Sequence, residues 1–481
     1  MEKKKTIKGF IWRFLERCSA QGVTFVTSII LARLLGPTAY GTIALITVFT
    51  SIMQVFIDSG LGTSLIQKKN ADDLDFSTVF WFNFGMCTLL YAVMYFSAPL
   101  ISKFYQLPEL TAYIRVLSLI LVLSGVKNIQ HAYVSRQMQF RSFFYASLGG
   151  TICSGVIAIF MAYRGYGVWA LVGQSLSNRV INTVILWFVV KWRPRWMFSW
   201  NRLKDLLSLG LNLLFAKLLD TVYQDLRTLL IGKIYSVESL GFYNKGKQFP
   251  HLVVNNVNVS IDSVLLPTMS KVQDSQEKIR AMVRRSISLS TYIMMPIMLG
   301  ISACAEPLVR ILLGEEWMPC VFFMRIFCIT YGFYPLATAN LNAIKAMKRG
   351  DLFLKLEISK KIVGVIALLI TLPIGIEAMA YSLLVTTIIS QMINSRPNKT
   401  LLNYRYIEQL RDILPNCLLS FGMGAVVYCV RFLGANDWVT LLIQVPLGIV
   451  LYVAFSIFFK IEGFYSILKI LKQFLKKGKK T

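Results

Sequence analysis

Basic side chains recur at helical spacing inside segments that are otherwise apolar. In the first such segment, Arg13, Arg17 and Gln21 are four residues apart and therefore share one face of a helix. A guanidinium binds a phosphate through two hydrogen bonds and a lysine ammonium binds it as a point charge, so this face could hold an anionic group. A charge left in hydrocarbon costs about 2.5 to 3.5 kcal/mol, so the face is expected to turn toward water or a partner. The candidate substrate-binding residues are Arg13, Arg17, Lys127, Arg179 and Lys217.

A second set of polar residues carries amide, imidazole and carboxyl groups. His251, Asn255 and Asp262 lie on one helical face, and at a shift of 204 residues Asp58 falls on Asp262. Polar faces at equivalent places in two halves predict a central hydrated cavity, and the acids suggest coupling to an ion. The alternatives are hydrogen bonds within a dry helix bundle, structural ion pairs, or basic side chains that reach the headgroups. The candidate cavity and ion-coupling residues are Gln21, Gln54, Asp58, Asp220, His251, Asn255, Asn258 and Asp262.

Membrane helices must position these residues. The chain has 481 residues, 55% of them apolar and 16% charged, whereas a soluble domain carries about 25% charged residues. A membrane-spanning helix needs about 20 apolar residues, so the pattern predicts an all-α polytopic membrane protein with about fourteen transmembrane helices. The expected helices cover residues 10–35, 41–61, 76–98, 114–134, 143–162, 168–190, 206–226, 240–266, 286–305, 319–341, 353–373, 377–395, 412–431 and 438–460.

Composition and motifs argue against several classes of function. Two histidines are too few for a His-rich zinc or haem site, and no G-x-x-x-x-G-K-[ST] loop is present to bind a nucleotide. The net charge of +27 suits loops that face an anionic cytoplasmic leaflet, because a nucleic-acid binder would not need an apolar majority. The sequence therefore predicts no metal, no cofactor and no nucleic-acid partner.

The distribution of lysine and arginine predicts the orientation. With a cytoplasmic N-terminus, the inner segments hold 31 of the 51 basic residues and the outer segments hold seven. Cytoplasmic loops carry the excess of basic residues in membrane proteins. Both termini are therefore expected in the cytoplasm.

An internal repeat predicts two related halves. Residues 39–41 fall on 239–241 at a shift of 200, and residues 57–59 fall on 261–263 at a shift of 204. Six helices per half is an even number, so the halves are expected to be parallel, with the substrate site between them. The expected domains are an N-terminal lobe at 1–195, a C-terminal lobe at 196–400, and two extra helices with a basic cytoplasmic tail at 401–481.

Three sequence words carry a resemblance to a known family. They are IILARLLGPTAYG at residues 29–41, DSGLGTSLIQ at 58–67 and GYGVWALV at 165–172, and Gln21 precedes them. With the fourteen-helix pattern, the chain resembles the polysaccharide transporter family of lipid-linked oligosaccharide flippases, in the branch that contains the colanic acid and teichuronic acid exporters.

The resemblance implies a fold, a substrate and a location. It places the chain in the multidrug, oligosaccharidyl-lipid and polysaccharide exporter superfamily, with two six-helix lobes in a V around a central cavity. Such proteins move an undecaprenyl-pyrophosphate-linked oligosaccharide from the inner to the outer leaflet of the bacterial cytoplasmic membrane by alternating access. Membrane lipid, a polysaccharide polymerase and assembly proteins are the partners that it suggests. No residue motif for substrate or ion is carried over from the family.

Three other functions fit parts of the pattern. A cation-coupled multidrug antiporter shares the architecture, but its cationic substrates favour acids, and here bases outnumber them. A membrane polymerase or ligase would carry a large external catalytic loop, and the longest outer segments expected, residues 99–113 and 306–318, are too short. A scaffold for glycan assembly needs neither the repeat nor the polar faces. The expectation is therefore a transporter and not an enzyme.

Overall fold

Helices make up nearly all of the chain in the computed structural model, which describes residues 2–57, 61–62, 65, 68, 71–136 and 140–478. No β-strand occurs among these residues. The predicted all-α class is therefore confirmed. The chain divides into two compact units, Met1–Gly241 and Phe242–Thr481, which are described separately.

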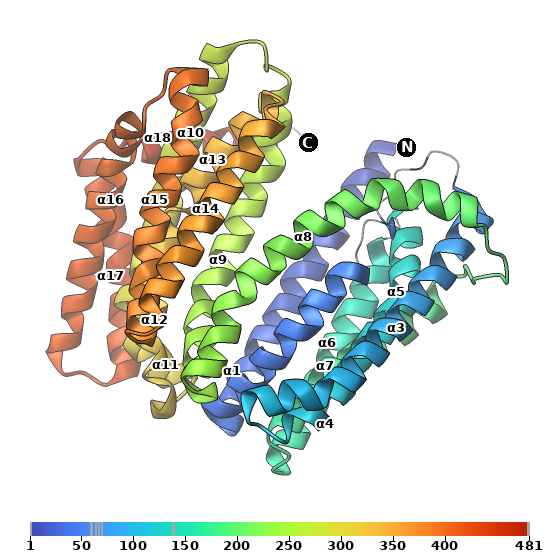
Figure 1. Ribbon diagram of the computed structural model, residues 1–481. Helices are drawn as coiled ribbons and strands as arrows, with labels where there is room; N and C mark the ends of the chain where they lie inside the picture. Colours follow the sequence, from blue (N-terminus) through green and yellow to red (C-terminus); the bar gives the residue numbers. More distant parts are fainter. Residues whose placement is uncertain are drawn as a thin grey trace. The chain divides into compact units, whose positions relative to one another are not determined.

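The first unit begins with a long, kinked helix, α1 (Glu2–Ile57). The helix is interrupted at Gly36, whose φ of 69° lies in the left-handed region that glycine tolerates, and Pro37 follows without an amide donor. Two arms therefore replace the separate helices expected at 10–35 and 41–61. The other helices are α3 (Asp73–Tyr105), α4 (Leu110–Leu117), α5 (Leu119–Arg136), α6 (Phe140–Tyr163), α7 (Val168–Val189) and α8 (Trp200–Ile234) (Figure 1).

The second unit begins within α9 (Val237–Ser270), because the boundary between the units lies between Gly241 and Phe242. Within the unit, α16 and α17 form an antiparallel helical hairpin (Figure 1). The other elements are α10 (Gln276–Ala303), α11 (Ala305–Leu312), η1 (Glu315–Trp317), α12 (Cys320–Gly332), α13 (Tyr334–Ala346), α14 (Gly350–Thr371), α15 (Ile376–Leu402), α16 (Tyr406–Cys429), η2 (Val430–Leu433), α17 (Asp437–Phe458) and α18 (Glu462–Gly478).

Two segments expected as an outer loop and a tail are helical. Residues 306–318 form most of α11 together with η1, and Ala305 and Val309, which are four residues apart on α11, are both buried. Part of the basic tail forms α18, in which Phe464 and Ile467 pack against a hydrophobic cluster around Tyr292. Apolar spacing of three and four residues explains both helices.

Each unit has its own hydrophobic core. In the first unit, Phe76, Phe80 and Leu186 are buried around Trp192. In the second unit, Ile279, Ile287, Leu336 and Ile413 are buried in one cluster from α10, α13 and α16. These cores fix the backbones from which the polar faces project.

Two glycines from the internal repeat lie at a close helix contact. A Cβ at Gly41 would lie 1.7 Å from the carbonyl oxygen of Val237, and a Cβ at Gly241 would lie 2.1 Å from that of Pro37. Only glycine allows backbones to approach so closely. The matching words at the 200-residue shift therefore pack against each other inside the first unit.

Candidate functional site

Hydropathy separates the long helices into two classes. Nine segments of the described chain are long and apolar enough to cross a membrane, including the two outermost helices of the second unit, α16 and α17. Three other helices of 22 residues or more, α7, α9 and α14, do not reach that apolarity in the described part of the chain. Two of these three carry candidate site residues, namely Arg179 on α7 and His251 on α9. A helix with a polar stripe needs water or a polar partner along that stripe.

The polar face of α8 joins α1 in the first unit. The Ser51 hydroxyl on α1 donates a hydrogen bond of 2.8 Å to Asp225 Oδ2 on α8. The adjacent Gln224 donates through Nε2 to Asp220 Oδ2, about one turn earlier on α8, at 2.7 Å. Lys217 is exposed on this helix. The sequence analysis missed Asp225, although an acid beside Gln224 near the end of the span expected at 206–226 was a usable signal.

Lys127 and Arg179 lie on the neighbouring helices α5 and α7, and both are half-buried. The adjacent Asn178 amide faces α6, where it donates to the Ser154 hydroxyl at 3.3 Å. One turn from Lys127, the ring of His131 stacks on Phe143 at 4.3 Å between centroids. Lys127, Arg179, Lys217 and Asp220 all have interaction partners in the structure. A partner within the fold does not exclude contact with a substrate, so the binding role of these bases stays a prediction.

The polar face of α9 is more open. His251, Asn255 and Asp262 are exposed, and Asn258 is half-buried with a side-chain oxygen that has no hydrogen-bond partner. Toward its start, α9 packs on α12 through Tyr243, whose ring lies 5.2 Å from that of Phe327. A dry bundle would enclose such side chains in partner helices. Within the second unit, the exposure of this face favours a wet surface.

The remaining candidate residues lie on α1 or just after it. The side chains of Arg13 and Arg17 and the whole of Asp58 lie outside the described residues. Gln21 and Gln54 lie on the two arms of α1 and are half-buried. The described part of the chain contains no group of three or more His, Cys, Asp or Glu side chains that could hold a metal ion.

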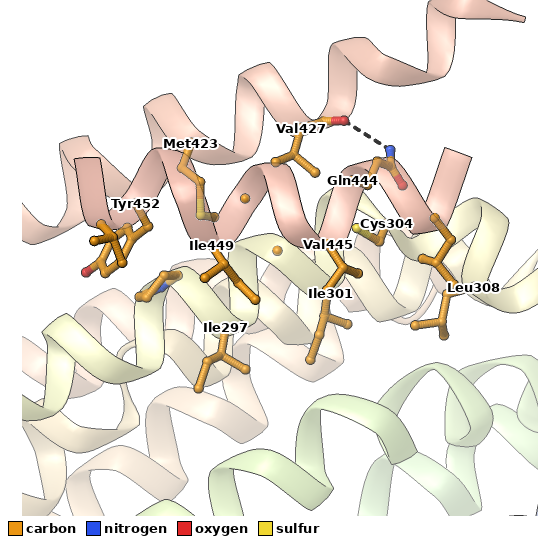
Figure 2. A pocket seen from close by; sticks show the side chains of 15 residues that line it. Ile297, Ile301, Cys304, Leu308, Met423, Val427, Gln444, Val445, Ile449 and Tyr452 are labelled. Atoms are coloured by element: carbon orange, nitrogen blue, oxygen red, sulfur yellow. Dashed lines mark hydrogen bonds between the residues drawn. The ribbon is translucent and has the colours of Figure 1, made fainter. Parts of the chain in front are cut away.

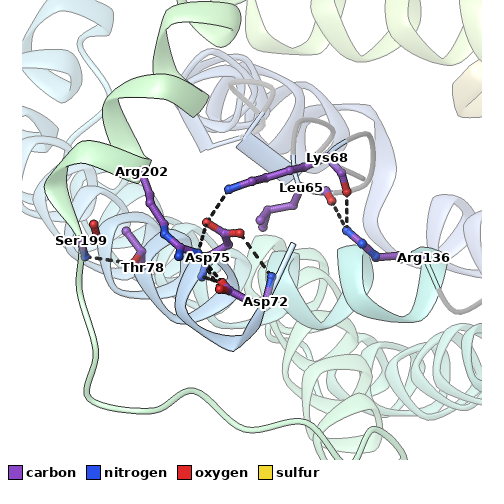
Figure 3. Close-up of polar contacts among 8 residues, drawn as sticks. All are labelled: Leu65, Lys68, Asp72, Asp75, Thr78, Arg136, Ser199 and Arg202. Carbon is purple, nitrogen blue, oxygen red and sulfur yellow. Dashed lines mark hydrogen bonds and ion pairs between the residues drawn. The ribbon is translucent and has the colours of Figure 1, made fainter. Parts of the chain in front are cut away.

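An ion-pair network that the sequence analysis missed lies at the start of α3 (Figure 3). Asp75 is fully buried there, and Lys68 Nζ lies 2.7 Å and Arg202 3.2 Å from its Oδ1. Arg202 also lies 2.6 Å from Asp72, and this guanidinium lowers the pKa of Asp72 to about 2. Arg136 donates to the carbonyl oxygens of Leu65 and Lys68 at 2.9 and 2.8 Å. The signal for this network was the sequence Asp-Asp-Leu-Asp before an apolar run, because Asp72 and Asp75 form a capping box.

A second ionic cluster joins α11, α12 and η2 in the second unit. Glu306 Oε1 lies 2.9 Å from Arg325 and 2.6 Å from Arg431. Arg310 pairs with Glu315 and Asp437 at 2.6 and 2.9 Å. These pairs connect α11 to α12 and α17 and to the short helices η1 and η2.

An apolar groove of about 370 Å³ lies between α10, α16 and α17 (Figure 2). Ile297, Ile301, Val445 and Ile449 line it, and Gln444, one of its few polar side chains, donates to the Val427 carbonyl oxygen at 3.0 Å. A phosphate or sugar would find no charged partner here. The groove suits a hydrocarbon chain.

Solved structures of membrane transporters share this fold. The chain matches the lipid II flippase MurJ in an inward closed conformation with a TM-score of 0.74 and 17% identity, over 94% of this chain and 99% of that one. It also matches an inward-facing multidrug resistance MATE family transporter of the MOP superfamily with a TM-score of 0.63 and 14% identity, over 81% of this chain and 99% of that one. At these identities the likeness concerns the fold alone. The chain has the fold of a multi-pass membrane transporter.

A family model identifies the protein family within this class of fold. Residues 30–322 match the family described as polysaccharide biosynthesis protein, and the chain belongs to that family. It is 25% identical over 310 residues to the teichuronic acid biosynthesis protein TuaB of Bacillus subtilis (strain 168), a match that covers 63% of each chain. It is 23% identical over 442 residues to the lipopolysaccharide biosynthesis protein WzxC of Escherichia coli (strain K12), covering 88% of this chain and 89% of that one. The family that the sequence resembles is therefore confirmed.

Proposed function

We propose that this protein moves an undecaprenyl-pyrophosphate-linked oligosaccharide from the inner to the outer leaflet of the bacterial cytoplasmic membrane. The movement serves cell-surface polysaccharide biosynthesis and proceeds by alternating access. The observation that carries the proposal is the match of residues 30–322 to the polysaccharide biosynthesis family, in a chain with a transporter fold. Both termini lie in the cytoplasm in this proposal, because the inner segments then hold most of the basic residues.

The polar helices supply the path for the headgroup. A pyrophosphate and its sugars need water or hydrogen-bonding side chains along the whole crossing, whereas the prenyl chain stays in lipid. The bases Arg13, Arg17, Lys127, Arg179 and Lys217 hold the pyrophosphate, since guanidinium and ammonium groups complement its charge. The amides of Gln21, Gln54, Asn255 and Asn258, together with His251, hydrogen-bond the sugars.

The apolar groove offers a place for hydrocarbon. Its lining from α10, α16 and α17 excludes charge, and its volume of about 370 Å³ accommodates part of an isoprenoid chain. The groove thus complements the polar helices. A carboxylate from Asp58, Asp220 or Asp262 couples transport to a proton or sodium gradient in this proposal.

The test measures lipid-linked oligosaccharide in the inner leaflet of cells that lack the protein. We expect the intermediate to accumulate, and we expect the wild-type protein to relieve the accumulation. A Lys217→Glu form should insert normally and fail to relieve it, because it reverses a charge on the polar face of α8. Lys204→Glu is the matched control, since Lys204 is exposed on the same helix near its first turn.

Each outcome has a defined meaning. If cells without the protein do not accumulate the intermediate, the flippase proposal fails and the cation-coupled multidrug antiporter becomes the better account of the fold. If both lysine variants restore export, the flippase proposal stands and the assignment of Lys217 fails.

A further inference from the structure

The linker of residues 190–199, which joins α7 to α8, is non-helical but firmly held. The Trp81 indole on α3 donates to the Arg195 carbonyl oxygen at 2.8 Å, and the Arg195 amide donates to the Ser77 hydroxyl at 3.1 Å. Further along, the Ser199 amide donates to the Thr78 hydroxyl at 3.1 Å. Because hydrogen bonds fix its backbone on both sides of its centre, the linker presents its side chains from a defined surface.

One residue anchors the linker in the core. Trp192 is buried, and its indole donates to Asp73 Oδ1 at 3.2 Å. Its carbonyl oxygen accepts a bond of 3.1 Å from Gln130 on α5. The inward-facing side of the linker is therefore satisfied by the first unit itself, and the outward-facing side is left for another partner.

The outward-facing side is aromatic. Trp196 is 88% exposed and stacks on Trp81 at 4.1 Å between ring centroids. Phe198 and Trp200 are 50% and 57% exposed. Large aromatic rings with a polar edge are enriched where a membrane meets water, because one part of the ring is apolar and the other is wet.

The linker also exposes basic side chains. The linker sequence contains Lys191, Arg193 and Arg195 and no Asp or Glu. Arg193 is turned back onto the carbonyl oxygen of Trp192 at 2.8 Å, which leaves Lys191 and Arg195 as the outward cations. Arg195 is 68% exposed, and its distance of 3.5 Å from the half-exposed Asp73 is a weak surface pair.

The neighbouring cavity does not suit an anion. It measures about 300 Å³ and is lined by Asp72 and Asp73, together with Arg136 and the aromatic residues Phe76 and Tyr133. Two carboxylates repel a phosphate, so an anionic group is favoured on the outer side of the linker instead. The linker starts after α7, which ends at Val189, and the preceding residue Phe188 is 83% exposed, as expected for a helix end that leaves lipid.

We propose that the linker of residues 190–199 is a preformed binding surface for the headgroups of anionic phospholipids. Trp196, Phe198 and Trp200 lie at the depth of the headgroups, and Lys191 and Arg195 bind their phosphates. The surface holds the junction of α7, α3 and α8 at the membrane boundary. A phospholipid is favoured over a protein partner because the surface combines exposed aromatic rings with cations. The cavity beside it is lined by carboxylates and offers no second site for an anionic group.

The test compares lipids with different headgroups on the purified full-length protein in detergent. Phosphatidylglycerol should raise the melting temperature more than phosphatidylcholine with the same acyl chains. A basic residue beside an anionic surface contributes about a five-fold gain in affinity, so Lys191→Gln/Arg195→Gln should weaken the apparent phosphatidylglycerol affinity by about 30-fold. Lys103→Gln/Arg164→Gln is the matched control, since both residues are exposed basic groups of the first unit away from the linker.

The proposal is overturned if phosphatidylglycerol gives no extra stabilisation, if the linker variant keeps it, or if the control variant loses as much. Both variants must melt like the wild type in phosphatidylcholine, which separates lost binding from lost folding. Undecaprenyl phosphate provides another arm: a linker variant that loses binding to this lipid alone would assign the surface to the carrier lipid and overturn the phospholipid assignment.

A second measurement reports whether Trp196 lies at the depth of the lipid. In vesicles of brominated phosphatidylglycerol, Trp196→Phe should remove a large part of the quenched indole emission, because bromine quenches rings that touch the lipid. Trp317→Phe should leave the quenched part unchanged, since Trp317 is fully buried. Emission from Trp196 that bromine does not quench would overturn membrane contact and favour a soluble partner.

Discussion

The charged groups at the start of α3 and the polar groups on α9 differ in how they are satisfied. Asp75 is fully buried and has two cations within 3.2 Å. On α9, His251, Asn255 and Asp262 are exposed instead. A buried charge survives only with partners, whereas a polar face that remains exposed on a helix of a membrane protein keeps its capacity to bind. The comparison separates charges that stabilise the fold from charges that can serve a substrate.

The largest effect is expected from Asp75→Ala. The change removes a buried carboxylate that pairs with Lys68 and Arg202, and hydrogen bonds to charged groups contribute about 1.5 to 3 kcal/mol each. We expect the melting temperature to fall by several degrees, while transport per folded molecule stays unchanged. Asp75→Asn should lose less, because the amide oxygen can still accept the Asp72 amide hydrogen bond. If Asp75→Asn lost transport but kept full stability, the start of α3 would no longer differ in role from the polar face of α9.

A smaller effect, confined to transport, is expected from Asp262→Asn. The carboxylate is exposed on α9, so the neutral isostere should leave the melting temperature within about 1 °C of the wild type. If this acid couples transport to an ion, the acceleration produced by a proton or sodium gradient should fall several-fold in proteoliposomes. Asp274→Asn is the control, because Asp274 is an exposed acid in the turn that follows α9. Equal responses of the two variants would argue against coupling at Asp262.

The apolar groove provides a third region, which contains no charged side chain. Ile449→Trp should fill part of its volume of about 370 Å³ and weaken the apparent affinity for the lipid-linked substrate by about two- to five-fold. The comparison is with Leu442→Trp, since Leu442 is 71% exposed on the same helix and does not line the groove. An unchanged affinity in Ile449→Trp would exclude the groove from substrate binding.

The smallest effect is expected from acid acting on Asp72. Arg202 lowers the pKa of this carboxyl from 3.8 to about 2 in the folded protein, so its stabilisation is complete above about pH 4 and is lost as the pH falls toward 2. Because the pair lies at the surface, we expect the melting temperature of wild type and Asp72→Asn to converge by only about 1 °C over this range. A convergence already present between pH 7 and 5 would contradict the pairing.

Much of the fold could be predicted from local sequence. The break at Gly36 and Pro37 and the apolar spans of α3, α6 and α17 depend on residues near one another in the chain. Two expected helices are split, at Ser118 between α4 and α5 and at Phe333 between α12 and α13, and no glycine or proline signal separates the arms at Ser118. Such breaks depend on tertiary packing, which periodicity does not report.

The sequence predicted which side chains of the candidate site share a helix face. It did not predict which side chains on different helices contact one another. Spacing placed His251, Asn255 and Asp262 together because all three lie on one helix. The bond between Ser51 and Asp225 joins residues 174 positions apart, and the pairing of Arg202 with Asp72 joins residues 130 positions apart. A helical pattern contains no information on such pairings. The repeat gave an indirect indication of one long-range contact, because its matched glycines, Gly41 and Gly241, lie at the same close approach.

The most direct test of the account measures transport and melting temperature together for Lys217→Gln and Asp75→Asn. Both variants are reconstituted at equal folded amounts in vesicles that contain a lipid-linked oligosaccharide, and the movement of the substrate between leaflets is followed. The account predicts that Lys217→Gln loses transport at least ten-fold with an unchanged melting temperature, and that Asp75→Asn loses stability with unchanged transport per folded molecule. The reverse pattern, or equal losses of both properties in both variants, would contradict it.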